Sequence, residues 1–283
     1  LRIWVASSNY SEDLRIDYSI LDQHAESYRK IRNTFRYLLG NIKDNFEEID
    51  FKKVDLNELP ELEQFMLHKL YSLDVNFKKY FKNYDFHNLY KELLNFCTVD
   101  LSAFYFDIRK DSLYCDSIDS KNRKSTILLL NIILNSLLKW FAPILSFTTE
   151  EIYRLIFKDS KSIHLEKFLN FPNNFENEKL YQKWLDLIKI RNICNISIEE
   201  KRANKEIGSS LEADLNIHLD KKLKEITKNI DFSELCITSK AQISFNEKLE
   251  TSAQTTKAKG TKCTLCWKIS ENACDRTHCP KNT

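Results

Sequence analysis

Residues 17–40 read DYSILDQHAESYRKIRNTFRYLLG, and the spacing of their side chains is typical of an amphipathic α-helix. The side chains of one face recur at steps of three and four residues: Ile20, His24, Tyr28, Ile31, Phe35, Leu38 and Leu39. Gly40 is well placed to end the helix, because glycine favours the position after the last turn. A helix with one apolar face must bury that face against other elements, so this stretch predicts a helical bundle.

Three further stretches predict helices for the same bundle. Apolar positions recur at helical spacing in residues 60–77 and again in residues 86–106. The most apolar run, residues 126–147, is interrupted by polar residues and by Pro143, whereas a helix that spans a bilayer needs about 20 nearly unbroken apolar residues. We therefore expect this run to be a helix buried in the bundle, and we predict no membrane span.

The composition excludes several classes of protein. The 283 residues include only three glycines, where average usage would give about 20. The chain therefore contains no glycine-rich loop that could cradle phosphates. Four prolines and few turn dipeptides argue against a many-stranded β-sandwich, so a mainly α fold remains. Because the net charge is only +2, an acidic partner would have to meet local clusters of basic side chains.

The pattern changes after Ser160, from long helical periods to short strand-like segments. Residues 162–165, 215–219 and 242–245 alternate or cluster like strands, which predicts a small α+β module. The segment after it contains almost nothing to bury and is predicted to be a tether. The predicted organisation is a linker at 1–16, a helical bundle at 17–158, a small α+β domain at 159–246, a tether at 247–260 and a knuckle at 261–283.

The eight cysteines are unevenly placed along the chain. Four are scattered, and we expect them to be small buried side chains in a reducing compartment: Cys97, Cys115, Cys194 and Cys236. The other four are gathered near the end: Cys263, Cys266, Cys274 and Cys279. The first two form a C-x2-C pair and the last two a second pair, a pattern typical of structural zinc. Four thiolates would complete a tetrahedral shell around one ion, and we expect this coreless segment to be unfolded without it.

The sequence leaves the chemistry of this cluster open in two respects. His278 precedes Cys279, so three cysteines and His278 form an alternative ligand set. Disulfides and idle thiols are further alternatives, as is a thiol enzyme that uses Cys263 and Cys266.

Basic side chains gather at two places. Arg29, Arg32 and Arg36 share one flank of the predicted helix at 17–40, because steps of three and four residues return to the same side. They form either a solvated face or a ridge that contacts phosphates. In the cysteine segment, Trp267 follows the second predicted ligand, with Lys268 and Arg276 nearby. Trp267 either offers a stacking face to a nucleic-acid base or covers the metal site.

The order of these segments resembles the carboxy-terminal part of bacterial-type isoleucyl-tRNA synthetases. The opening LRIWVASSNY (1–10) is similar to the segment after the family's second ATP-binding motif. YRKIRNTFRYLLGN (28–41) resembles the first helix of its anticodon-binding bundle, and DLSAFYFD (100–107) resembles the third. APILSFTTEEIY (142–153) resembles a bundle segment shared with valyl and leucyl relatives. IGSSLEA (207–213) and the terminal cysteines favour the isoleucyl family.

The resemblance implies that this chain grips the anticodon stem and loop of an isoleucine tRNA. The family attaches isoleucine to tRNA with ATP and Mg²⁺ in a catalytic domain, and it has an editing domain; both are implied to lie upstream of Leu1. No catalytic residue is therefore expected in this chain, which should be inactive alone. The implied setting is a monomer in the cytoplasm. The expected tRNA contacts are Arg29, Arg32, Arg36, Trp267, Lys268 and Arg276.

The residues alone also allow a function of another class. A helical scaffold whose zinc knuckle docks a protein would have the same periodicity and the same cysteine pattern. Binding to RNA at low salt would separate the two hypotheses.

Overall fold

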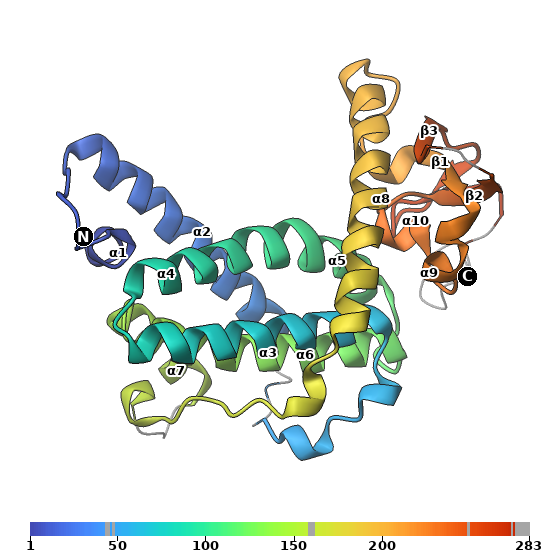
Figure 1. The fold of residues 1–283 in the computed structure, drawn as a ribbon. Helices are drawn as coiled ribbons and strands as arrows, with labels where there is room; N and C mark the ends of the chain where they lie inside the picture. Colours follow the sequence, from blue (N-terminus) through green and yellow to red (C-terminus); the bar gives the residue numbers. More distant parts are fainter. Residues whose placement is uncertain (43–45, 47–48, 158–161, 248–249, 273, 275–283) are drawn as a thin grey trace. The chain divides into compact units, whose positions relative to one another are not determined.

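The computed structural model describes residues 1–42, 46, 49–157, 162–247, 250–272 and 274 (Figure 1). The described chain is mainly helical, with one three-stranded and one two-stranded sheet. It forms two compact units, of which the first comprises Leu1–Phe106 and Lys121–Asn177. The second comprises Asp107–Ser120 and Glu178–Thr283. The prediction of a mainly α fold with a small α+β module is confirmed.

The first unit is a bundle of long helices around a core of aliphatic side chains and large aromatic rings. Helix α6 packs against α2 and α3, and α4 packs against α3. Its largest buried side chains include Phe35, Phe65, Phe77 and Trp140. The elements of this unit are α1 (Arg2–Ser7), α2 (Tyr18–Ile42), α3 (Glu61–Lys82), α4 (Phe86–Asn95), the π-helical segment η3 (Phe96–Tyr105), α6 (Lys121–Phe141), α7 (Ser146–Ile156), and the short helical turns η1 (Phe51–Lys53), η2 (Leu56–Glu58), η4 (Ile163–Leu165) and η5 (Asn173–Phe175).

Helix α2 follows the predicted amphipathic pattern. Ile31, Phe35 and Leu38 are buried, while the basic flank faces solvent. The Asp17 carboxylate accepts a hydrogen bond from the backbone N–H of Ile20 at 2.8 Å, which satisfies a free donor of the first turn. The predicted end at Gly40 is wrong by two residues, because the helix continues to the buried Ile42.

Helix α6 confirms the expectation that the most apolar run is buried in the bundle. Its polar side chains are satisfied within the helix: Asn131, Asn135 and Ser136 each donate to the carbonyl four residues earlier, at 3.1, 3.0 and 2.7 Å. Within the described residues, no helix has the length and apolar character needed to cross a membrane.

The second unit is built on a three-stranded sheet of order β2-β1-β3, with long helix α8 along one face (Figure 1). Strand β1 pairs in parallel with β2 and antiparallel with β3, and its alternate residues are buried. The elements are α5 (Phe106–Cys115), which begins on the last residue of the first unit, α8 (Glu178–Ala203), η6 (Ser210–Glu212), β1 (Ala213–Asp220), η7 (Lys221–Leu223), α9 (Lys224–Thr227), α10 (Phe232–Leu235), β2 (Lys240–Asn246), β3 (Ser252–Lys257), β4 (Thr261–Lys262) and β5 (Ile269–Ser270).

The predicted tether at 247–260 is wrong in its central part. Strand β3 lies inside it and pairs with β1 over six positions. Its Thr255 is buried and its hydroxyl lies 2.8 Å from that of Ser197 on α8. An edge strand is stabilised by its ladder of backbone hydrogen bonds, so a polar sequence with one buried side chain is sufficient.

The predicted domain boundaries also differ from the two compact units. The expected linker at 1–16 contains α1, whose Ile3 and Ala6 are buried, and the first unit continues beyond residue 158 to Asn177. Residues 107–120 belong to the second unit. The predicted strand at 162–165 is instead the single helical turn η4. The Ser162 hydroxyl caps this turn by accepting a hydrogen bond from the backbone N–H of His164.

The aromatic core predicts a large effect for Phe77, whose ring lies 5.1 Å from Phe168 and 5.8 Å from Trp140. Phe77→Ala should lower the free energy of unfolding by about 3–5 kcal/mol, because the substitution removes these contacts and leaves a cavity. Val75→Ala, on the solvent side of the same helix, should change it by at most about 0.5 kcal/mol. Urea denaturation followed by circular dichroism measures both values, and equal effects would contradict this packing.

Candidate functional site

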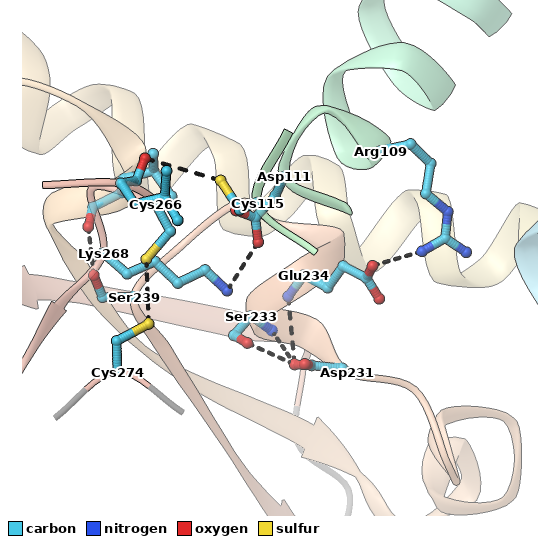
Figure 2. Close-up of polar contacts among 12 residues, drawn as sticks. Arg109, Asp111, Cys115, Asp231, Ser233, Glu234, Ser239, Cys266, Lys268 and Cys274 are labelled. Carbon is cyan, nitrogen blue, oxygen red and sulfur yellow. Dashed lines mark hydrogen bonds and ion pairs between the residues drawn. The ribbon is translucent and has the colours of Figure 1, made fainter. Parts of the chain in front are cut away.

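Three cysteines of the terminal segment converge on one point. The Sγ atoms of Cys263, Cys266 and Cys274 all lie within 4.8 Å of one another, and the first two side chains are buried. Figure 2 shows the close approach of Cys266 and Cys274, whose sulfur atoms are 3.9 Å apart. The two alternative fourth ligands, Cys279 and His278, lie outside the described residues. The structure therefore brings together three of the four predicted ligands.

A short hairpin shapes this cluster. Strands β4 and β5 pair antiparallel, and the C-x2-C turn lies between them. The backbone N–H of Leu265 donates to Cys263 Sγ at 3.4 Å, and the N–H of Trp267 donates to the Cys263 carbonyl at 3.1 Å. Gly260 enters the hairpin with a φ of +119°, and a Cβ there would lie 2.2 Å from the Ser270 carbonyl. The hairpin thus requires one of the few glycines in the chain.

The cluster fits a zinc ion by its chemistry and its spacing. Burial raises the pKa of the Cys266 thiol to about 12, and the neighbouring thiols of Cys263 and Cys274 act in the same direction. Thiolates at this spacing therefore need a cation between them. Four sulfurs at the tetrahedral Zn–S distance would lie about 3.8 Å apart. The observed 3.9 Å between Cys266 and Cys274 agrees with that spacing.

The scattered cysteines are buried, as expected for small apolar side chains: Cys97, Cys115, Cys194 and Cys236. Cys115 is nevertheless close to the thiol cluster and packs against Cys263 and Cys266. Its sulfur does not belong to the set of mutually close ligand atoms, so it is a neighbour of the candidate metal centre.

Trp267 is presented to solvent by a strained backbone. Its φ of +62° lies in the left-handed region, which costs energy for any residue other than glycine. The side chain is 60% exposed. Most of the indole is therefore accessible to a partner in solution.

The other predicted contacts differ in how accessible they are. Arg29, Arg32 and Arg36 are all exposed on α2, and Arg29 forms an ion pair with Glu26. The Lys268 ammonium lies 3.8 Å from the Asp111 carboxylate. Arg276 lies outside the described residues.

Sequence reasoning missed the surroundings of the cluster. Asp111 and Cys115 on α5 contact the hairpin, as does Ser239 before β2. Cys115 is 150 positions from Leu265 and Ser239 is 30 positions from Ile269, and no spacing rule connects such residues, so only the fold could identify them.

Comparison with known proteins adds the family. A family model described as "Anticodon-binding domain of tRNA ligase" matches residues 63–218. The chain is 68% identical over 276 residues to an isoleucine–tRNA ligase of Pelagibacter ubique, covering 98% of this chain and 30% of that protein. It is 38% identical over 281 residues to an isoleucine–tRNA ligase of Agrobacterium fabrum, covering 95% and 28%.

A third relative, an isoleucine–tRNA ligase of Zymomonas mobilis, is 39% identical over 272 residues, which are 94% of this chain and 28% of the relative. The chain thus spans less than a third of the length of these relatives. The family match covers more than half of the chain, from α3 to β1. The chain therefore belongs to the family of anticodon-binding domains of tRNA ligases.

Proposed function

We propose that this chain is the tRNA-binding part of an isoleucine–tRNA ligase and that it holds the anticodon stem and loop of isoleucine tRNA. The observation that carries the proposal is 68% identity to such a ligase over 98% of the chain. Isoleucine, ATP and Mg²⁺ are then handled by a catalytic domain of the same protein, and this chain alone is inactive. The full protein is a monomer that acts in the cytoplasm.

The basic flank of α2 supplies the contacts with the RNA backbone. From Tyr28 to Lys43 the sequence has five basic residues and no acidic one. Arg32 and Arg36 are exposed and lie one turn apart, so both guanidinium groups can reach the same strand of phosphates. Arg29 is also exposed, but its ion pair with Glu26 must be exchanged for a phosphate. Such contacts give affinity and register without reading a base.

Trp267 supplies a contact of a different kind. Single-stranded loops are recognised by bases that leave the stack and lie against aromatic rings. The exposed indole of Trp267 is suited to an unpaired base of the anticodon loop, and Arg276, nine positions later in the sequence, would supply a cation. The strained backbone that presents this ring is consistent with a role in binding.

A structural zinc ion holds the hairpin that carries Trp267. Cys263, Cys266 and Cys274 are three of its ligands, and Cys279 or His278 is the fourth. When bound, the ion neutralises the thiolates and cross-links a segment that has no apolar core of its own. A complete protein shell leaves no open position for substrate, so the site has no catalytic role.

The α2 flank generates the first prediction about binding. Replacing both Arg32 and Arg36 by Gln should weaken tRNA binding. The slope of the logarithm of the binding constant against the logarithm of the salt concentration should become shallower by about 0.7–0.9 for each lost phosphate contact. Arg154→Gln is a matched control, because Arg154 is an exposed arginine of the same unit that pairs with Glu150. Titrations of tRNA at several salt concentrations measure both quantities. A salt slope unchanged by the double substitution would leave the flank as a solvated face.

Trp267 generates a second prediction about binding. Trp267→Ala should weaken binding of isoleucine tRNA by about 1–3 kcal/mol, the usual value of one base stacked on an aromatic ring. Trp267→Phe should retain most of the affinity, and both variants should keep the zinc content of the wild type. If Trp267→Ala instead loses zinc and binds tRNA normally once zinc is restored, the ring is a cover and not a contact.

The thiol cluster predicts a bound metal. The purified protein should contain one zinc ion per chain by mass spectrometry of the metal, and Cys263→Ser should lose it, since serine is a poor zinc ligand. Cys97→Ala, which removes a buried thiol of the first unit, should keep the ion. A wild-type protein refolded with zinc but free of bound metal would contradict this assignment.

A further inference from the structure

The hairpin that carries the thiols is fastened to a helix from a distant part of the chain. Helix α5 and the hairpin belong to the same unit, and Figure 2 shows Asp111 and Cys115 of α5 directed toward Lys268 and the C-x2-C turn. These two α5 residues are four positions apart, so they lie on one face of the helix. That face has no part in the tRNA contacts proposed above.

The first fastening is a buried thiol. Cys115 Sγ donates to the carbonyl of Leu265 at 3.9 Å, and Leu265 lies between the ligands Cys263 and Cys266. Cys115 is 8% exposed and packs with both of these cysteines in one cluster. It therefore touches the backbone of the C-x2-C turn from outside the set of ligand atoms.

The second fastening is a half-buried ion pair. Lys268 Nζ lies 3.8 Å from Asp111 Oδ2, and the two side chains are only 26% and 21% exposed. The carbonyl of Lys268 also accepts the backbone N–H of Cys263 at 2.9 Å. Lys268 thus connects the ligand turn to α5, and its ammonium is engaged within the protein.

Other contacts hold α5 and the hairpin in their places within the second unit. Arg109, two residues before Asp111 on α5, pairs with Glu234 of α10 at 2.5 Å, and its own side chain is 3% exposed. The opposite strand of the hairpin donates from the N–H of Ile269 to Ser239 Oγ at 2.6 Å. Lys262 on β4 pairs with Glu212 at 3.4 Å. The hairpin therefore lies between α5 and the segment that leads into the sheet.

We propose that the metal-bound hairpin docks on the face of α5 formed by Asp111 and Cys115, a contact that we call the dock. Metal binding folds the turn into the shape in which the Leu265 carbonyl and Lys268 meet this face. Asp111 and Cys115 are positioning residues, which act through Leu265 and Lys268 and do not bind the metal. Under the proposed function, the docked hairpin holds Trp267 at a fixed place on the second unit. The main role of Lys268 is then its ion pair with Asp111, and a contact with RNA is secondary.

Linkage makes the dock measurable without RNA. If zinc favours docking, docking must favour zinc by the same factor. Loss of the ion pair should weaken zinc affinity by about 3- to 10-fold, since a half-buried pair contributes more than an exposed one. Loss of the ion pair removes no metal ligand, so the protein should still bind one zinc ion per chain at saturating zinc.

The test is a charge exchange across the pair in the full-length protein. Asp111→Lys and Lys268→Asp alone should each lower the affinity for zinc, measured by competition with a chelator. Each should also speed hydrogen exchange of the α5 amides 112–115. The double variant Asp111→Lys/Lys268→Asp should restore both. Asp111→Asn is a milder variant that tests the same pair if a charge reversal prevents folding. Lys110→Glu is the matched control, because Lys110 pairs with Asp107 on the same helix and should change neither readout.

Two outcomes would overturn the dock: α5 amides that exchange at the same rate with zinc and after chelation, or single variants that keep wild-type zinc affinity. Titration with isoleucine tRNA tests the proposed function separately. A double variant with restored zinc affinity and exchange supports the dock whatever its tRNA affinity. If wild-type protein docks the hairpin but fails to bind tRNA, the proposed function is wrong and the dock stands.

Discussion

Three sulfur atoms held within 4.8 Å of one another are the constraint on which the end of the second unit depends. The hairpin has only two-residue strands and a buried cluster made largely of thiols, so apolar burial alone provides little stability. A cation that joins the thiolates changes this balance, because its binding energy becomes folding energy. The position of Trp267, the engagement of Lys268 and the contact with α5 all follow from that turn being closed.

The two units contribute different kinds of chemistry. The first is a helical bundle whose interior combines leucine and isoleucine side chains with large aromatic rings, and its α2 carries guanidinium groups on a rigid element. The second places the exposed ring of Trp267, carried by a strained backbone, beside a compact turn. Guanidinium groups suit phosphates of any sequence, whereas an aromatic face suits an unpaired base. A tRNA anticodon stem and loop presents both features, which is why the family assignment and the surface chemistry support the same function.

Much of the fold could be predicted from periodicity, and the failures have physical causes. Ile31, Phe35 and Leu38 fixed the buried face of α2, but the end at Gly40 was wrong because packing of Ile42 outweighs a local capping preference. Strand β3 was missed because backbone pairing, and not side-chain burial, stabilises an edge strand. Cysteine spacing predicted the convergence of Cys263, Cys266 and Cys274. It could not predict Asp111 or Cys115, because only the tertiary fold brings α5 to the turn.

Chemical footprinting of isoleucine tRNA, nucleotide by nucleotide, tests the central claim most directly. With the zinc-loaded protein, the account predicts protection of backbone positions in the anticodon stem and of at least one loop base. Removal of zinc should selectively expose the loop base, while the α2 flank still protects the stem. Protection confined to the acceptor end, or no protection of the anticodon stem and loop at saturating protein, would contradict the account.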